Sequence, residues 1–254
     1  THCAGTIFGR DVLGKRIGVA PGVNKALIGK VISQGAGGDS DMVYLGIQWA
    51  MELGAHVISL SLSLDFTGYV SRMVGLGWPV ELATSNALTA YRGNLRLFDA
   101  LMQLVRVRAA TRQGVVIVGA CGNESKRDVN PAYKLAVSLP AAAEGVLAVG
   151  AVMRTGTRLL RVADFSNTFP QLVAPGVEVL SAKAGGGLEL QSGTSMACPH
   201  VAGAAALWWQ ALHESSTATA NAVMARLLST ALTDVFVEGT DQVDRGMGLA
   251  RVPT

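Results

Sequence analysis

The sequence predicts an α/β fold with a mostly parallel central sheet and helices on both of its faces. Four short apolar runs support this prediction, at residues 26–32, 56–62, 115–120 and 146–152. Uninterrupted runs rich in β-branched residues are typical of strands buried on both faces of a parallel sheet. Segments with helical spacing separate these runs, which indicates right-handed βαβ connections.

The helices expected between these strands follow from apolar spacing. A first helix covers residues 42–53, because Val43, Ile47 and Met51 recur every four positions on one face. A second begins near Pro79, which suits a first helical turn, and ends at Gly114. Its apolar stripe, with spacings of three or four residues, consists of Leu88, Tyr91, Leu95, Phe98, Met102 and Val105.

Composition excludes several classes of protein. The chain has 254 residues, half of them hydrophobic, which is enough for one large domain. The 21 basic and 18 acidic residues leave a net charge of +3, so neither nucleic acid nor a membrane is expected as a partner. Cys3, Cys121 and Cys198 are odd in number and widely spaced, which favours free thiols over disulfides or a zinc site.

Four arginines lie mostly beside the apolar stripe of the second helix: Arg92, Arg96, Arg106 and Arg108. A solvated helix face explains them best. A nucleic-acid contact is the alternative, but no stacking aromatic residues interleave with the arginines.

The most specific motif is the eleven-residue string GTSMACPHVAG, from Gly193 to Gly203. Gly193 permits a tight turn that exposes the hydroxyl of Ser195. The helix that follows favours negative charge at its N-terminus. A bare Gly-Thr-Ser could be only a helix cap, whereas the full string is far more specific.

This string resembles the serine motif of the subtilisin-like serine proteases, the subtilases. Two further blocks agree: residues 116–124, which end in Gly-Asn-Glu, and residues 1–6, which are similar to the tail of the family's His-Gly-Thr-His-Val-Ala-Gly-Thr block. Further matching segments lie at 18–21, 46–50, 174–177 and 245–249. The resemblance implies a three-layer subtilisin-like fold, and one peptidase domain over residues 1–254 with a helical insertion at about 65–90.

The resemblance also implies the chemistry, that of a serine endopeptidase working through an acyl-enzyme. Ser195 would be the nucleophile, and Asn123 with the backbone N–H of Ser195 would form the oxyanion hole. Without Ser195 in the same chain, Asn123 would be no more than a turn residue after a strand.

The family's catalytic base and acid have no counterpart in this chain, so we expect the domain to be incomplete at its N-terminus. His2 matches the second histidine of the block, which is not the base, and Asp11 lies after the block instead of before it. Of the other histidines, His200 is expected in the core, and His56 and His213 at the surface.

Three explanations remain open. The chain is a fragment of an active protease, the larger piece of a split enzyme, or a catalytically dead peptide-binding protein. A rival chemistry would use Thr1 as an N-terminal nucleophile. The residues that follow Thr1 instead match the family's helix after the catalytic histidine.

Substrate would bind as an extended strand between two segments, 35–39 and 61–64. The candidate contacts on these edges are Gly37, Gly38, Ser61, Leu62 and Ser63, and the pocket wall is formed by Ala120, Cys121 and Gly122. Ser63 and Leu64 replace the family's usual glycines, which predicts a reshaped pocket that is apolar or broadly tolerant. The insertion that follows is a lid or rim of this site, or a surface elaboration.

No cofactor is expected to be required. The family's calcium loop would fall at residues 10–18, where Arg10, Lys15 and Arg16 surround the single carboxylate of Asp11. Leu139-Pro140 resembles the family's cis-proline turn. The expected partners are a peptide or protein substrate and, in addition, an upstream fragment or a prodomain; the compartment stays open.

Overall fold

The structure, a computed structural model, describes residues 1–32, 40–111, 114–156 and 158–253. Its helices are α1 (His2–Phe8), α2 (Ser40–Glu52), α3 (Phe66–Gly75), α4 (Val80–Thr111), α5 (Thr194–Glu214), α6 (Ala220–Ser229) and α7 (Gln242–Arg245). Its strands are β1 (Val57–Leu60), β2 (Val116–Ala120), β3 (Leu147–Arg154), β4 (Leu160–Val162), β5 (Leu172–Pro175), β6 (Val179–Ala182) and β7 (Leu188–Gln191).

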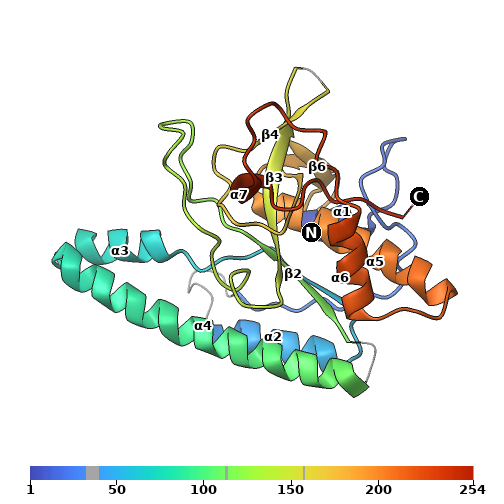
Figure 1. The fold of residues 1–254 in the computed structure, drawn as a ribbon, viewed down its shortest axis with the longest axis horizontal. Helices are drawn as coiled ribbons and strands as arrows, with labels where there is room; N and C mark the ends of the chain where they lie inside the picture. Colours follow the sequence, from blue (N-terminus) through green and yellow to red (C-terminus); the bar gives the residue numbers. More distant parts are fainter. Residues whose placement is uncertain (33–39, 112–113, 157, 254) are drawn as a thin grey trace.

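A five-stranded, mostly parallel sheet forms the centre of the molecule (Figure 1). β1 pairs with β2 with Val57 opposite Val116, and β2 pairs with β3 with Val118 opposite Leu147. β5 is also parallel to β3, whereas β4 is antiparallel to it. The predicted parallel sheet is therefore confirmed, and the carboxyl ends of β1 and β2 lie side by side.

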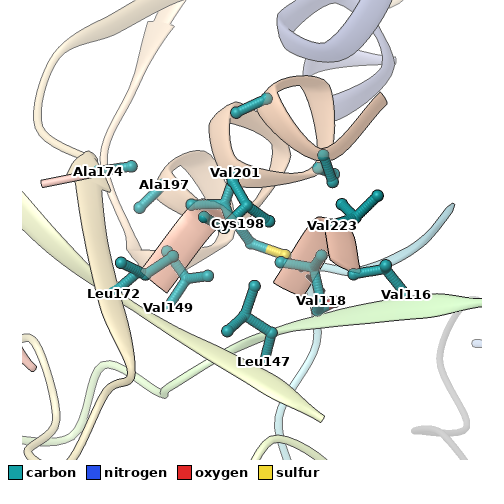
Figure 2. Close-up of a cluster of buried hydrophobic side chains, with 14 of the residues drawn as sticks. Val116, Val118, Leu147, Val149, Leu172, Ala174, Ala197, Cys198, Val201 and Val223 are labelled. Atoms are coloured by element: carbon teal, nitrogen blue, oxygen red, sulfur yellow. Dashed lines mark hydrogen bonds between the residues drawn. The ribbon is translucent and has the colours of Figure 1, made fainter. Parts of the chain in front are cut away.

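Helices cover both faces of this sheet, which makes three layers. On one face, Ile58 and Ile117 belong to a buried cluster with Phe98 and Leu101 of α4 and with residues of α2. On the other face, Val116 and Val118 pack with Val201 of α5 and other residues of α5 and α6 (Figure 2). The alternation along β2 sends neighbouring side chains to opposite layers, as expected for a strand buried on both sides.

The expected insertion is a helical hairpin. Asp65 caps the N-terminus of α3, and its carboxylate accepts a hydrogen bond from the backbone N–H of Gly68 at 2.7 Å. The first half of α4 runs back along α3. The Phe66 and Tyr91 rings meet there edge to face, with 6.1 Å between their centroids. α4 then continues as one 32-residue helix beneath the sheet in the view of Figure 1.

Two expectations about the elements are wrong. Residues 26–32 form no strand, because no described strand pairs with them, and Ile28 is 74% exposed. Leu88 is also exposed, at 48%, since α4 reaches the sheet only in its second half, where Phe98 and Leu101 are buried. No helix among the described residues is both long and apolar enough to cross a bilayer.

Candidate active site

Ser195 lies at the start of α5, beside the end of β1. Gly193 precedes the helix with a φ of 150°, a conformation that side chains disfavour. The Oγ of Ser195 donates a hydrogen bond to the carbonyl oxygen of Ser61 at 3.3 Å. In return, the Ser61 hydroxyl and the Cys3 thiol donate to the carbonyl oxygen of Ser195, at 2.9 and 3.4 Å. Two segments distant in sequence, at Cys3 and Ser61, thus fix the backbone of Ser195.

Asn123 follows β2 and faces the same helix N-terminus. Its Oδ1 accepts hydrogen bonds from the backbone N–H of Thr194 at 2.8 Å and from the Thr194 hydroxyl at 2.9 Å. The Thr194 hydroxyl oxygen accepts one from the Gly122 N–H at 3.2 Å. The Oδ1 accepts both bonds from Thr194, whereas the Nδ2 of Asn123 has no acceptor among the described residues and is available as a donor.

A second donor lies at the first turn of α5. The backbone N–H of Ser195 makes no hydrogen bond to any described residue, as usual for the first N–H groups of a helix. The dipole of the 21-residue helix adds partial positive charge at this end. Asn123 and Ser195 therefore place two free donors near the half-buried hydroxyl of Ser195, an arrangement suited to a developing oxyanion.

Asn167 holds the backbone that directly follows Asn123, a role that the sequence analysis did not predict. It is fully buried, and its Oδ1 accepts hydrogen bonds from the N–H groups of Glu124 and Ser125 and from the Ser125 hydroxyl. Its Nδ2 donates to the Glu124 carboxylate at 2.6 Å and to the carbonyl oxygens of Cys121 and Ala136. A lone asparagine in an irregular segment gives no signal of this role in a single sequence.

None of the four histidines is hydrogen-bonded to the Ser195 hydroxyl within the part of the chain that the structure describes. His2 is buried and bonds the carbonyl oxygen of Val179 at 2.9 Å. His200 bonds the carbonyl oxygen of Met196 at 2.8 Å, and burial lowers its pKa. His56 is exposed to solvent and has one ring contact, with Trp209. His213 is exposed in the last turn of α5.

The buried cysteines cannot replace the serine as nucleophile, because their thiols stay protonated near neutral pH. Burial raises the pKa of Cys198 to about 11, although hydrogen bonds with Ser59 and Ser61 oppose the shift. Burial also raises the pKa of Cys121 far above its usual range. Both are free thiols, as is Cys3.

The predicted substrate contacts occupy the carboxyl ends of β1 and β2. Ser61, Leu62 and Ser63 continue from β1 and are half-buried, while Ala120, Cys121 and Gly122 are buried where β2 ends. The N–H of Leu64 is already bonded to the carbonyl oxygen of Leu139, at 2.8 Å. The Leu139-Pro140 peptide bond is cis, as expected. Gly37 and Gly38 lie outside the described residues.

The loop considered for calcium is a tight turn, with Val12 and Lys15 bridged to each other. Among the described residues, no three His, Cys, Asp or Glu side chains are grouped closely enough to hold a metal ion. That the protein requires no cofactor stays a prediction.

Sequence comparison connects this geometry to known proteins. The sequence pattern of the subtilase family matches residues 1–249. Subtilisin DY of Bacillus licheniformis is 34% identical over 243 residues, which cover 94% of this chain and 73% of that protein. The thermostable alkaline protease of Halalkalibacterium halodurans is 34% identical over 82% of this chain. The chain spans 45% of that relative's length.

Solved structures agree on the fold. The patellamide maturation protease PatA superimposes with a TM-score of 0.64 at 28% identity, over 99% of this chain and 79% of PatA. The prenylagaramide maturation protease PagA gives a TM-score of 0.62 at 24% identity, a likeness that concerns the fold alone. Both alignments extend over nearly the whole chain, including the elements that carry Ser195 and Asn123.

Proposed function

The chain belongs to the subtilase family, and we propose that it carries the nucleophile and the oxyanion hole of a serine endopeptidase. The observation that carries this proposal is the pair of free donors, Asn123 Nδ2 and the Ser195 N–H, beside the Ser195 hydroxyl. Substrate would be a peptide in extended conformation, bound along residues 61–64 and against Ala120, Cys121 and Gly122.

The reaction divides into two acyl transfers. The Oγ of Ser195 attacks the carbonyl carbon of the scissile peptide bond while a base removes the hydroxyl proton. The tetrahedral intermediate carries its negative charge on the former carbonyl oxygen, which Asn123 and the Ser195 N–H stabilise. Collapse of the intermediate expels the amine, which takes the proton, and leaves an acyl-enzyme on Ser195. Water then attacks the ester carbonyl carbon, the bond from that carbon to the Oγ of Ser195 breaks, and Oγ regains its proton as the carboxylic acid product leaves.

We expect the base to be a residue other than the four histidines of this chain, because none of them is hydrogen-bonded to the Ser195 hydroxyl among the described residues. His2 and His200 are each bonded to a backbone carbonyl oxygen. His56 contacts the Trp209 ring of α5, and His213 lies in the last turn of that helix, away from Ser195 at its start. Removing one member of a catalytic triad abolishes most of its effect, because the members act as a unit. We therefore assign to this chain the attacking hydroxyl and the oxyanion donors, and we assign endopeptidase activity to the complete protein that also supplies the base.

A fluorophosphonate probe tests the proposal in the natural gene product. The probe reacts covalently only with an activated serine, so mass spectrometry should find it on Ser195. A Ser195→Ala variant should lose both labelling and cleavage of a chromogenic peptide, while keeping its melting temperature. A folded gene product that binds peptides but is neither labelled nor able to cleave them would make it a non-catalytic peptide-binding protein instead.

A further inference from the structure

A buried carboxylate near the end of the chain holds both arms of the loop that follows Asn123. Asp244 lies on α7 and is 8% exposed. Its Oδ1 accepts a hydrogen bond from Nη2 of Arg127 at 2.7 Å, and its Oδ2 accepts one from Nζ of Lys134 at 2.6 Å. Arg127 stands on the outgoing arm of the 124–138 loop and Lys134 on the returning arm. One carboxylate therefore spans the loop, and we call these three residues the clamp.

Further bonds of Arg127 anchor the clamp to the body of the fold. The guanidinium donates to the carbonyl oxygen of Ser166, and the backbone N–H of Arg127 donates to that of Asp164 at 3.1 Å. The side chains of Arg127 and Asp244 are only 10% and 11% exposed. Removing one partner of such a shielded pair leaves the other charge buried and unpaired, so the loop must move to solvate it.

Both ends of the clamped loop rest on the wall proposed for the substrate pocket. The N–H of Ser138 donates to the carbonyl oxygen of Cys121 at 2.8 Å, and the Ser138 hydroxyl donates to the Glu124 carboxylate at 3.3 Å. The loop thus leaves the wall at Glu124 and returns to it at Ser138. A shift of the clamped middle of the loop is therefore transmitted to the wall at both ends.

Asn123 is also held by bonds to α5 that the clamp residues do not make. Its amide is bonded to Thr194 on α5, and the adjacent backbone is bonded to the buried Asn167. Loss of the clamp should therefore disturb the pocket wall more than the oxyanion donors.

We propose that Asp244 is a positioning residue. Through Arg127 and Lys134 it sets the shape of the proposed substrate pocket, whose wall is residues 120–122. This inference rests on the proposed function, since it assigns a role in substrate selection to the same site. It predicts that the clamp governs how well side chains of different size are bound, and leaves the rate of the chemical step nearly unchanged.

The test compares Asp244→Asn with the unaltered natural gene product on peptide substrates whose residue before the scissile bond is small or large. Asparagine keeps the shape but not the charge. We expect KM to rise by about fivefold or more for substrates of one side-chain size, while kcat stays within about twofold. This is the pattern expected when a variant loses binding that the ground state and the transition state share equally. Asp244→Glu, which retains a carboxylate, should recover part of the selectivity. Glu144→Gln is the matched control, because it removes an exposed ion pair with Arg106.

Peptide binding to a Ser195→Ala background, measured by calorimetry, repeats the comparison without catalysis. It therefore separates this inference from the proposed function, whose failure would appear as an inactive but peptide-binding wild type. Should Asp244→Asn fail to fold, Lys134→Met removes one arm of the clamp at a side chain that is 27% exposed. Unchanged selectivity in a folded variant would overturn the inference, as would an equal fall in kcat for every substrate.

Discussion

Thr194 bonds the amide oxygen of Asn123 twice, through its backbone N–H at 2.8 Å and its hydroxyl at 2.9 Å. An asparagine amide has one acceptor end and one donor end. With the acceptor end held by Thr194, the donor end is left for a substrate. The orientation of Asn123, the proposed oxyanion donor, is therefore set by the residue immediately before Ser195, the proposed nucleophile.

Thr194→Val should lower kcat in the natural gene product. Valine keeps the branched shape but removes the hydroxyl, so Asn123 loses one of its two bonds and Gly122 loses its acceptor. A net loss of about 1 kcal/mol per hydrogen bond corresponds to a rate reduction of about five- to tenfold, with KM nearly unchanged. Thr194→Ser retains the hydroxyl and is the control. An unaltered kcat for the valine variant would show that the backbone bond alone orients Asn123.

Gly122→Ala should destabilise the fold markedly. Gly122 has a φ of 108°, and a methyl group there would collide with Glu124, Asn167 and Ser138. Strain at such a backbone position costs about 1–3 kcal/mol before the collisions are counted. Gly77→Ala is the control, because Gly77 has a φ of 89° but nothing within 4 Å of the added methyl group. Urea unfolding of the two variants should show the larger loss at Gly122; equal losses would mean that the Asn167 network yields easily.

The clamp should make stability dependent on pH in the acid range. Although burial raises the pKa of Asp244, hydrogen bonds and charge from Lys134 and Arg127 outweigh it and lower the pKa below its usual value near 3.8. The stabilisation is therefore fully present above the unfolded-state pKa and is lost as pH falls through the lower folded-state value. Asp241 also approaches Lys134, at 4.0 Å, and Arg245 is adjacent in sequence.

Melting temperatures of the wild type and of Asp244→Asn, measured between pH 7 and pH 3, test this dependence. The variant should melt lower near neutral pH, by the equivalent of about 3 kcal/mol for a broken buried pair. The difference should begin to shrink as the pH falls below the unfolded-state pKa near 3.8, and it should go on shrinking toward the lower folded-state pKa. A constant difference across the whole range would mean that packing of Asp244, and not its charge, is what stabilises.

The central fold was predictable because its strands are apolar runs that need no distant information to recognise. The apolar run that includes Val116, Ile117 and Val118 predicts a strand buried on both faces. The apolar spacing within residues 80–111 predicts the helix α4. The predicted strand at 26–32 failed for the opposite reason, since a strand exists only with a neighbour to pair with. Asn167 and Asp244 were missed because their roles depend on partners more than 30 residues away, which no local pattern records.

The two halves of α4 should differ in their importance for stability. Leu101 is 1% exposed in the cluster between α4 and the sheet, whereas Leu88 is 48% exposed on the half that packs with α3. Leu101→Ala should cost about 2–5 kcal/mol of unfolding free energy, because it removes buried methyl groups and leaves a cavity. Leu88→Ala should cost less than about 1 kcal/mol, as usual for an exposed site. Urea titrations measure both, and a large loss at Leu88 would show that the hairpin is covered in solution by something that shields this side chain.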